Sequence, residues 1–296
     1  MSPELTNLVA RATDLTMRGD LDGASSVLSQ IVEMEPDWVP GLLEYGGMLQ
    51  RLGQFQNGLR PLGHAFRLAP DNWRAAFSLG GGLHNVSRDA EAASMLRRAS
   101  ILAPDQPTAL AHLCYSEQRS GRPGAALVSI RWVLCLAALS FQALALKALC
   151  LANLSRHDEA IIAARRSLLI NPEAPRLERH LAISYSLRAN NEEAVLAMRR
   201  ACQMAPSWGE AWLGLAGAFF GEGRYPKAEH AARRALELGA APPESHFLLA
   251  RVLWALDQRG RATEHFKQAV ELDPAREIDA KIAQLTITSI DFAYHD

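Results

Sequence analysis

The sequence has few cysteines and no excess of charge of either sign. Its four cysteines lie far apart and form no Cys-x-x-Cys pair: Cys114, Cys135, Cys150 and Cys202. They fit small buried side chains better than a disulfide framework or a zinc site. The 31 basic and 32 acidic side chains give a net charge of -1. Because a nucleic-acid-binding protein usually shows a basic excess, no nucleic-acid partner is expected.

Signals for a membrane or for secretion are also missing. The least polar stretch, residues 132–146, is 15 residues long, whereas a membrane-spanning helix needs about 20 predominantly apolar residues. This stretch therefore indicates buried helices and no membrane span. The first residues of the chain include Glu4, Arg11 and Asp14 and lack the apolar core of a signal peptide. We expect a cytoplasmic protein.

Catalytic motifs are absent from the sequence as well. It contains no His-Glu-x-x-His, no Gly-x-Ser-x-Gly and no phosphate-binding loop. The nine histidines are scattered, and none stands at metal-binding spacing beside cysteines or carboxylates. We therefore expect no enzyme, no catalytic residue, no metal site and no cofactor.

What the sequence does have is a period of 34 residues. Six prolines fall on one grid of this period: Pro36, Pro70, Pro104, Pro172, Pro206 and Pro274. Each follows an apolar run, where proline ends a helix because it lacks the amide donor and clashes with the preceding turn. A start at Leu5 divides the chain into eight units: 5–38, 39–72, 73–106, 107–140, 141–174, 175–208, 209–242 and 243–276.

Two positions of each unit hold a small residue. The eighth positions are Ala12, Gly46, Gly80, Cys114, Ala148, Ala182, Ala216 and Ala250. The twentieth positions are Ala24, Gly58, Ala92, Ala126, Ala160, Ala194, Ala228 and Ala262. Small residues at fixed places on two successive helices allow the two backbones to approach closely. Each unit is therefore predicted to be a helix, a turn and a second helix.

The repeated pattern resembles the tetratricopeptide repeat family, whose unit is a helix–turn–helix of the same length. The resemblance covers residues 5–276 and is clearest in Trp212-x-x-Leu215-Ala216-x-x-Phe219, followed by Ala228 and Ala235. It implies an all-α fold, a right-handed superhelical solenoid of eight repeats. Four charged residues depart from the pattern. Glu178 stands where a large apolar residue is usual and Glu117 where an aromatic one is, and Lys147 and Arg11 replace leucine-like positions.

The ends of a repeat array need closure, because each unit buries its apolar face only against its neighbours. After the last repeat, Ile278, Ile282 and Leu285 recur at helical spacing. We expect a C-terminal capping helix over residues 277–290. Residues 291–296 are expected to form a tail that the repeat does not explain.

In this family the first helix of each unit lines a concave groove, so the resemblance implies which residues face a ligand. The implied groove residues are Arg74, His84, His112, Tyr115, Arg119, Leu149, Arg176, Arg179, His180, Phe247, Arg251 and Trp254. We expect a groove that is positive in its middle over an apolar floor, and a protein or peptide partner that bears acidic residues. The alternative is that these charges are simply solvated.

Three glycines add a more specific expectation. Gly214, Gly217 and Gly221 stand at spacing i, i+3, i+7, which places them on one face of a helix. Each glycine costs about 0.5–1 kcal/mol relative to alanine, so three on one face need a reason. One interpretation is a bare strip that forms a slot for an apolar group of the partner. The other is that the glycines relieve crowding between neighbouring helices.

The second helices carry a column of basic residues at the twenty-fifth position of six units: Arg97, Arg131, Arg165, Arg199, Arg233 and Lys267. We interpret it as a solvated face, with an acidic partner or a membrane surface as the alternative. Two functions remain open for the whole chain. The first is a scaffold or adaptor that binds a peptide segment in its groove. The alternative is a recruiting or regulatory arm of a larger glycosyl-, sulfo- or oxygenase-type enzyme whose catalytic domain is absent here.

Overall fold

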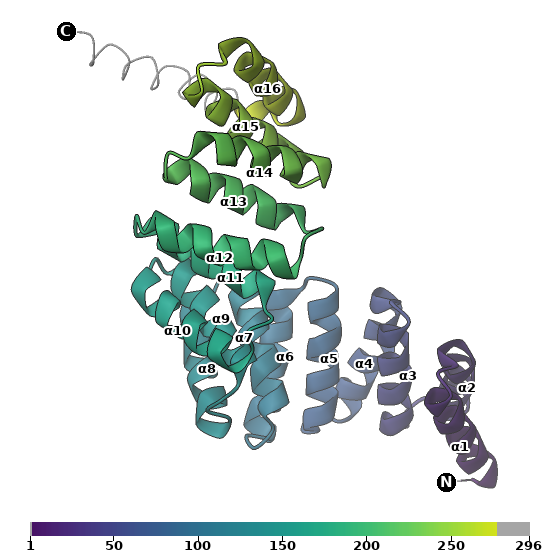
Figure 1. Ribbon diagram of the computed structural model, residues 1–296. Coiled ribbons are helices and arrows are strands. Elements are labelled where there is room, and N and C mark those ends of the chain that lie inside the picture. Colours follow the sequence, from purple (N-terminus) through teal and green to yellow (C-terminus); the bar gives the residue numbers. More distant parts are fainter. Residues whose placement is uncertain (1, 277–296) are drawn as a thin grey trace. The chain divides into compact units, whose positions relative to one another are not determined.

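The computed structural model describes residues 2–276, which form sixteen α-helices and one short 3-10 turn, with no strand in that range (Figure 1). The expected capping helix, 277–290, and tail, 291–296, lie outside the described residues. The chain divides into two compact units, Met1–Cys150 (unit 1) and Leu151–Asp296 (unit 2), and each is described by itself. The all-α repeat fold expected from the sequence is confirmed.

Unit 1 contains four complete helix pairs and most of a ninth helix. These are α1 (Pro3–Met17), α2 (Leu21–Met34), α3 (Val39–Arg51), α4 (Phe55–Leu68), α5 (Trp73–Asn85), α6 (Asp89–Leu102), α7 (Pro107–Arg119), α8 (Pro123–Leu136) and the start of α9 (Phe141–Asn153). Each first helix packs against its own second helix, and α3, α5 and α7 also contact one another in succession. The first helices therefore share one face of this unit.

Unit 2 repeats the same arrangement. Its helices are α10 (His157–Ile170), α11 (Pro175–Leu187), α12 (Asn191–Met204), α13 (Gly209–Gly221), α14 (Tyr225–Glu237), α15 (Pro242–Ala255) and α16 (Arg259–Leu272), followed by the turn η1 (Pro274–Arg276). Here α11, α13 and α15 contact one another in succession, so the first helices again share one face. None of the helices described exceeds 15 residues, and none has the length and hydropathy of a membrane-spanning segment.

The turn inside each helix pair fixes the period. One residue there has a positive φ in all eight pairs, and these residues are 34 apart: Gly19, Ser87, Asp257 and their equivalents Gly53, Gly121, Ser155, Ala189 and Gly223. Four of them are glycine, which adopts this backbone conformation without steric cost. The other four are serine, alanine or aspartate at φ of 58–61°, a conformation that is uncommon for such residues. The tight turn is thus kept even where the sequence does not favour it.

The core lies between the paired helices. All sixteen small residues at the eighth and twentieth positions of the expected units are buried. A Cβ added to Gly46 would lie 2.6 Å from Leu62, and one added to Gly80 would lie 2.7 Å from Leu96. These distances show that the small residues leave room for large side chains of the facing helix.

The two glutamates that depart from the repeat pattern are buried and paired. Glu117 accepts hydrogen bonds from Arg97 Nη2 at 2.7 Å and from Ser129 Oγ at 2.8 Å. Glu178 binds Arg200 through both carboxylate oxygens, at 2.7 and 2.9 Å. A buried carboxylate is costly unless it is paired. The interpretation of the basic column as a merely solvated face is therefore wrong for Arg97, whose guanidinium neutralises a buried charge.

Candidate functional site

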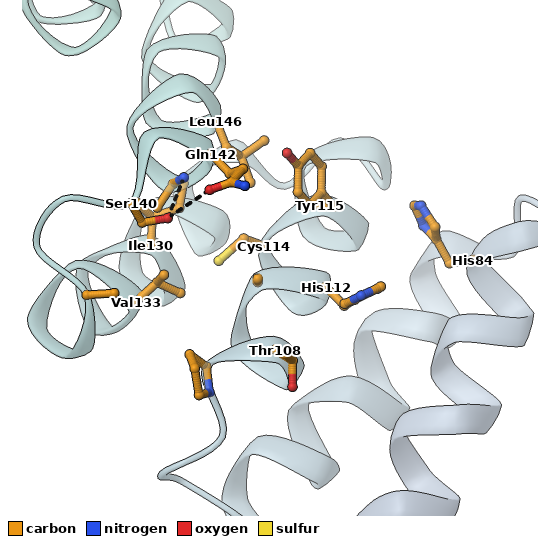
Figure 2. Close-up of a pocket in the computed structure, with 14 residues that line it drawn as sticks. His84, Thr108, His112, Cys114, Tyr115, Ile130, Val133, Ser140, Gln142 and Leu146 are labelled. Carbon is orange, nitrogen blue, oxygen red and sulfur yellow. Dashed lines mark hydrogen bonds between the residues drawn. The ribbon is translucent and has the colours of Figure 1, made fainter. Parts of the chain in front are cut away.

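The first-helix face of unit 1 contains a hollow of about 610 Å³ (Figure 2). It lies among α7, α8 and the start of α9, with His84 of α5 at one edge. Its apolar wall is formed by Ala111, Cys114, Ile130, Val133, Ala143 and Leu146. Its polar rim includes His84, Thr108, His112, Tyr115, Ser140 and Gln142. Figure 2 shows the α7 residues between His84 on one side and the α9 residues on the other.

Small side chains on the facing helices account for the hollow. Ala111 of α7 and Ala143 of α9 line it together with Ala137, which directly follows α8. Beneath them, Ile130 and Val133 belong to the buried apolar cluster that α7, α8 and α9 share. The wall is therefore part of the core, and its shape is fixed by core packing.

The rim nearest α5 is held by an ion-pair network around Asp89. His84 Nδ1 lies 2.6 Å from Asp89 Oδ1, and Arg119 Nε donates to Asp89 Oδ2 at 3.0 Å. Ser116 Oγ lies 3.3 Å from the same His84 nitrogen. In a Ser-His-Asp catalytic triad the serine and the aspartate contact different nitrogens of the histidine. The network therefore orients His84 and neutralises Asp89, but it does not have the geometry of a triad.

Burial shifts the pKa of three titratable groups at the hollow, His112, Tyr115 and Cys114. Burial, and then the nearby His84, lower the pKa of His112, whose ring meets Phe77 edge-on at 5.2 Å. Burial raises the pKa of Tyr115, which is still 42% exposed. Burial, followed by Glu117, raises the pKa of the Cys114 thiol to about 12. Because the thiolate is the reactive form, Cys114 acts here as an apolar wall group.

Three of the groove residues expected from the sequence, His84, His112 and Tyr115, do lie together at this hollow. Arg119 joins them through Asp89, and Leu149 packs half-buried against the same apolar cluster. Arg74 is not among the lining residues, and its guanidinium lies 5.6 Å from the Trp73 ring. The wall residues of α8 were missed, because second helices were not expected to contribute to the groove.

In unit 2 the expected cations of α11, Arg176 and Arg179, form no ion pair with a carboxylate among residues 2–276. Arg176 is exposed and Arg179 is half-buried, and the Nε atom of Arg179 is buried without a hydrogen-bond partner in the described part of the chain. Burial, and then Arg179, lower the pKa of His180. This short stretch thus places His180, with its lowered pKa, beside two arginines that form no ion pair within residues 2–276.

The aromatic residues expected beside the groove in unit 2 pack on α16. Phe247 and Trp254 both meet the Phe266 ring, with centroids 5.7 and 6.3 Å away. Arg251 lies over the Phe220 ring at 4.6 Å. Burial lowers the pKa of Arg251, and no carboxylate within residues 2–276 forms an ion pair with it. Arg251 is therefore a partly desolvated cation whose described contact is an aromatic face.

The expected bare strip of three glycines requires a correction. A Cβ on Gly214 would collide with the Met198 side chain of α12, and one on Gly221 would lie 3.2 Å from Asn191. Asn191 Nδ2 also donates to the Gly221 carbonyl at 2.9 Å. Nothing lies within 4 Å of a Cβ on Gly217. Because α12 covers two of the three positions, relief of crowding explains Gly214 and Gly221, and only Gly217 leaves open surface.

A sequence model described as a tetratricopeptide repeat matches residues 115–176 and 181–245, and a second one matches residues 243–276. Together they cover more than half of the chain. The chain belongs to the tetratricopeptide repeat family. A search of curated proteins found no match.

Solved tetratricopeptide repeat structures share the fold. A chain of the APC/C Cut9–Hcn1 heterotetramer aligns over 93% of this chain and 54% of its own length, with a TM-score of 0.65 and 18% identity. A tetratricopeptide repeat protein from Parabacteroides merdae ATCC 43184 aligns over 85% of this chain and 100% of its own, with a TM-score of 0.68 and 16% identity. YrrB, described as having an unusual peptide-binding site, aligns over 62% of this chain and 95% of its own, with a TM-score of 0.53 and 17% identity. The chain spans about half the length of the Cut9–Hcn1 chain.

Proposed function

We propose that this protein is an interaction scaffold that holds a peptide segment of a partner on the first-helix face of unit 1, with an apolar side chain of the peptide in the hollow. The tetratricopeptide repeat fold supports protein-interaction scaffolds in general, and its members are typically non-catalytic. The observation that carries the proposal is the hollow itself, about 610 Å³ in volume with a largely apolar wall.

The size and chemistry of the hollow suit one large apolar side chain and the backbone that carries it. Ligand sites are usually concave, mostly apolar and about 300–1,000 Å³ in volume, with a few polar groups that fix orientation. Here the neutral wall offers no partner for a charge, whereas Thr108, Ser140 and Gln142 at the rim provide hydrogen-bonding groups for a peptide backbone. Each Å² of apolar surface removed from water stabilises the complex by about 25 cal/mol. An aromatic or leucine side chain in the hollow would therefore supply most of the binding free energy.

The unpaired cations of unit 2 support a second element of the proposal, which is that the partner carries acidic residues. Arg251 and Arg179 have no carboxylate partner within residues 2–276, and both are partly buried. A guanidinium in such a position gains most from a charge-assisted hydrogen bond to a carboxylate. YrrB, with its named peptide-binding site, is a relative of the same fold that supports peptide recognition.

A cytoplasmic location and the absence of catalysis are also part of the proposal. Cys114, Cys135, Cys150 and Cys202 are all free thiols, and three of them are buried. Free thiols of this kind suit a reducing compartment.

The proposal is tested by filling the hollow. Ala111→Phe places a ring in the space that the peptide side chain would take, whereas Ala145→Phe changes the same position of the next repeat, which does not line the hollow. Short random peptides displayed on phage are selected on the full chain, and affinities are then measured by calorimetry. We expect selected peptides to share a large apolar residue and to bind Ala111→Phe about tenfold or more weakly.

The control variant Ala145→Phe should bind the same peptides like the unmodified chain, and circular dichroism should show that both variants are folded. Equal affinity for all three proteins would contradict the proposal, as would selected peptides without an apolar residue in common.

A further inference from the structure

Helix α8 carries a row of large apolar side chains that point to solvent. Val128, Trp132 and Leu136 stand at spacing i, i+4, i+8 and are each more than half exposed; Leu139, three residues beyond Leu136, is 75% exposed. This spacing places the three helical residues on one face. We call these four residues the α8 row. Contiguous exposed apolar side chains on a folded protein mark interaction surfaces.

Trp132 stands where the preceding second helices have a basic residue. Arg98 of α6 and His64 of α4 occupy the same position one and two repeats earlier, and each contacts an aspartate 27 residues before it. His64 Nε2 lies 2.8 Å from Asp37 Oδ1, and Arg98 Nη2 lies 3.1 Å from Asp71 Oδ1. These contacts tie each second helix to the loop that precedes its helix pair.

In the α7–α8 pair the aspartate of this contact is present, but Trp132 replaces the basic residue. The equivalent aspartate, Asp105, is present in the sequence, but it forms no ion pair in the part of the chain that the structure describes. Trp132 is 60% exposed and does not replace the contact. More than half of the Trp132 side chain is therefore open to an external partner. Tryptophan is also among the residues most enriched in binding hot spots.

Two exposed arginines lie in or beside helix α8. Residues 92–150 contain six arginines and lysines, of which Arg97, Arg98 and Arg119 are paired with Glu117, Asp71 and Asp89. Glu117 is buried and paired with Arg97, so its charge does not reach the surface. Arg122 and Arg131, on either side of Val128 in the sequence, are exposed. A second copy of this chain would bring two basic surfaces together, whereas an acidic partner is complementary.

A second exposed apolar patch lies on α6. Ile101 and Leu102, the equivalents of Cys135 and Leu136 one repeat earlier, are exposed. They line a hollow of about 570 Å³ together with Phe66, Met95 and two arginines. Because Phe66 belongs to α4 and the other lining residues to α6, this hollow lies between α4 and α6.

We propose that the α8 row is a second interaction surface, which binds an acidic amphipathic helix of a protein partner. The apolar stripe of such a helix packs on Trp132 and its neighbours, and its carboxylates face Arg131 and Arg122. Recognition of an amphipathic helix through anchors at i, i+4 and i+7 is a general mode of peptide binding. This surface lies on a second helix and does not depend on the hollow, so the chain holds two partners, or two segments of one partner.

The test uses the full chain and Trp132→Arg, which restores the type of residue found at His64 and Arg98 and offers Asp105 a partner. The matched control is Leu169→Arg on α10, a substitution at an 83% exposed leucine outside the row. The probe is a synthetic fluorescein-labelled helical peptide with leucines at i, i+4, i+7 and i+11 and glutamates on its other faces. A scrambled peptide of the same composition accompanies it.

Fluorescence anisotropy should show that the helical peptide binds the unmodified chain and Leu169→Arg equally, and binds Trp132→Arg about tenfold or more weakly. The scrambled peptide should bind weakly to all three. The hollow-filling variant Ala111→Phe should bind the helical peptide normally, which separates this proposal from the proposed function. If Trp132→Arg does not fold, Leu139→Ser in the connection after α8 serves in its place.

Several results would overturn the proposal. These are no binding of the helical peptide, equal binding of the scrambled peptide, and equal binding by Trp132→Arg. Self-association that depends on Trp132, seen by light scattering, would assign the row to a second copy of this chain instead. Trp132-dependent binding to phosphatidylserine vesicles without binding of the peptide would assign it to a membrane surface.

Discussion

The first-helix faces of units 1 and 2 are built from the same repeat but have opposite chemistry. In unit 1 the charges at the rim neutralise one another, because Arg119 and His84 both contact Asp89. What remains is an apolar hollow with neutral polar groups at its edge. In unit 2, Arg179 and Arg251 have no ion pair within the described residues, and Arg251 lies over Phe220.

The difference shows that the repeat fixes the positions of the side chains on this face but not their residue types. The ninth position of the repeat is Tyr115 in the fourth repeat and Arg251 in the eighth, and the thirteenth is Arg119 in the fourth and Gly221 in the seventh. Neither backbone nor helix length distinguishes the two faces. A scaffold of this kind can therefore present an apolar site and a cationic site on one chain.

The largest expected effect compares the two buried glutamates. Arg200→Met in unit 2 removes both hydrogen bonds to Glu178 and leaves that carboxylate without a partner, which should lower the free energy of unfolding by about 2–3 kcal/mol. Arg97→Met in unit 1 should cost less, because Glu117 keeps its bond from Ser129. Urea denaturation of both variants measures the difference. Equal losses, or a larger loss for Arg97→Met, would show that the serine does not compensate.

A smaller difference in the free energy of unfolding is expected between alanine substitutions at two glycines of α13. Gly217→Ala adds a methyl group where nothing lies within 4 Å, so it should raise the free energy of unfolding by about 0.5–1 kcal/mol through the higher helix propensity of alanine. Gly214→Ala should gain less or destabilise, because the Met198 side chain has to move. The same denaturation experiment compares them. An equal gain for both would mean that α12 does not cover Gly214.

The smallest expected effect is a pH dependence in unit 2. His246 and His265 stack with their Nδ1 atoms 3.0 Å apart, and burial lowers the pKa of both rings, with His246 as a further cause for His265. A histidine whose pKa is lower in the folded state binds fewer protons there than when unfolded, so stability falls as the pH drops below about 6.5. At neutral pH this effect is absent.

His265→Gln should therefore lose less thermal stability than the unmodified chain between about pH 7 and pH 5. The measurement is the unfolding temperature as a function of pH, followed by circular dichroism. Parallel curves for the two proteins would rule out this pair as a source of acid sensitivity.

Much of the fold was predictable because the repeat depends on particular residue types at fixed positions, which the sequence shows directly. Proline spacing and small residues at two positions revealed the period and the helix pairs. Four of the eight positive-φ turn residues were visible as glycines, whereas Ser87 and Asp257 carry no such signal. Their backbone conformation follows from the helix packing on either side and not from their own preference.

The candidate site was predictable only in part. His84, His112 and Tyr115 stand at first-helix positions that the family resemblance points to. The hollow, however, also depends on Ile130 and Val133 of a second helix, and periodicity within one helix does not show which neighbours will face it. For the same reason the bare strip predicted on α13 was wrong. Met198, which lies against Gly214, belongs to a different helix, and the spacing of the glycines does not show it. The only sequence signal near the hollow was the apolar character of residues 132–146. It indicated that these helices are buried, but it did not indicate a hollow between them.

In the proposed function, the hollow of unit 1 receives the apolar side chain of a bound peptide. Hydrogen exchange measured by mass spectrometry, with and without a peptide selected on the full chain, locates the bound peptide on the protein. We expect slower exchange in α7 and in the first half of α9, with the slowing lost in Ala111→Phe. Slower exchange confined to unit 2 or to second helices, with α7 unchanged, would contradict it.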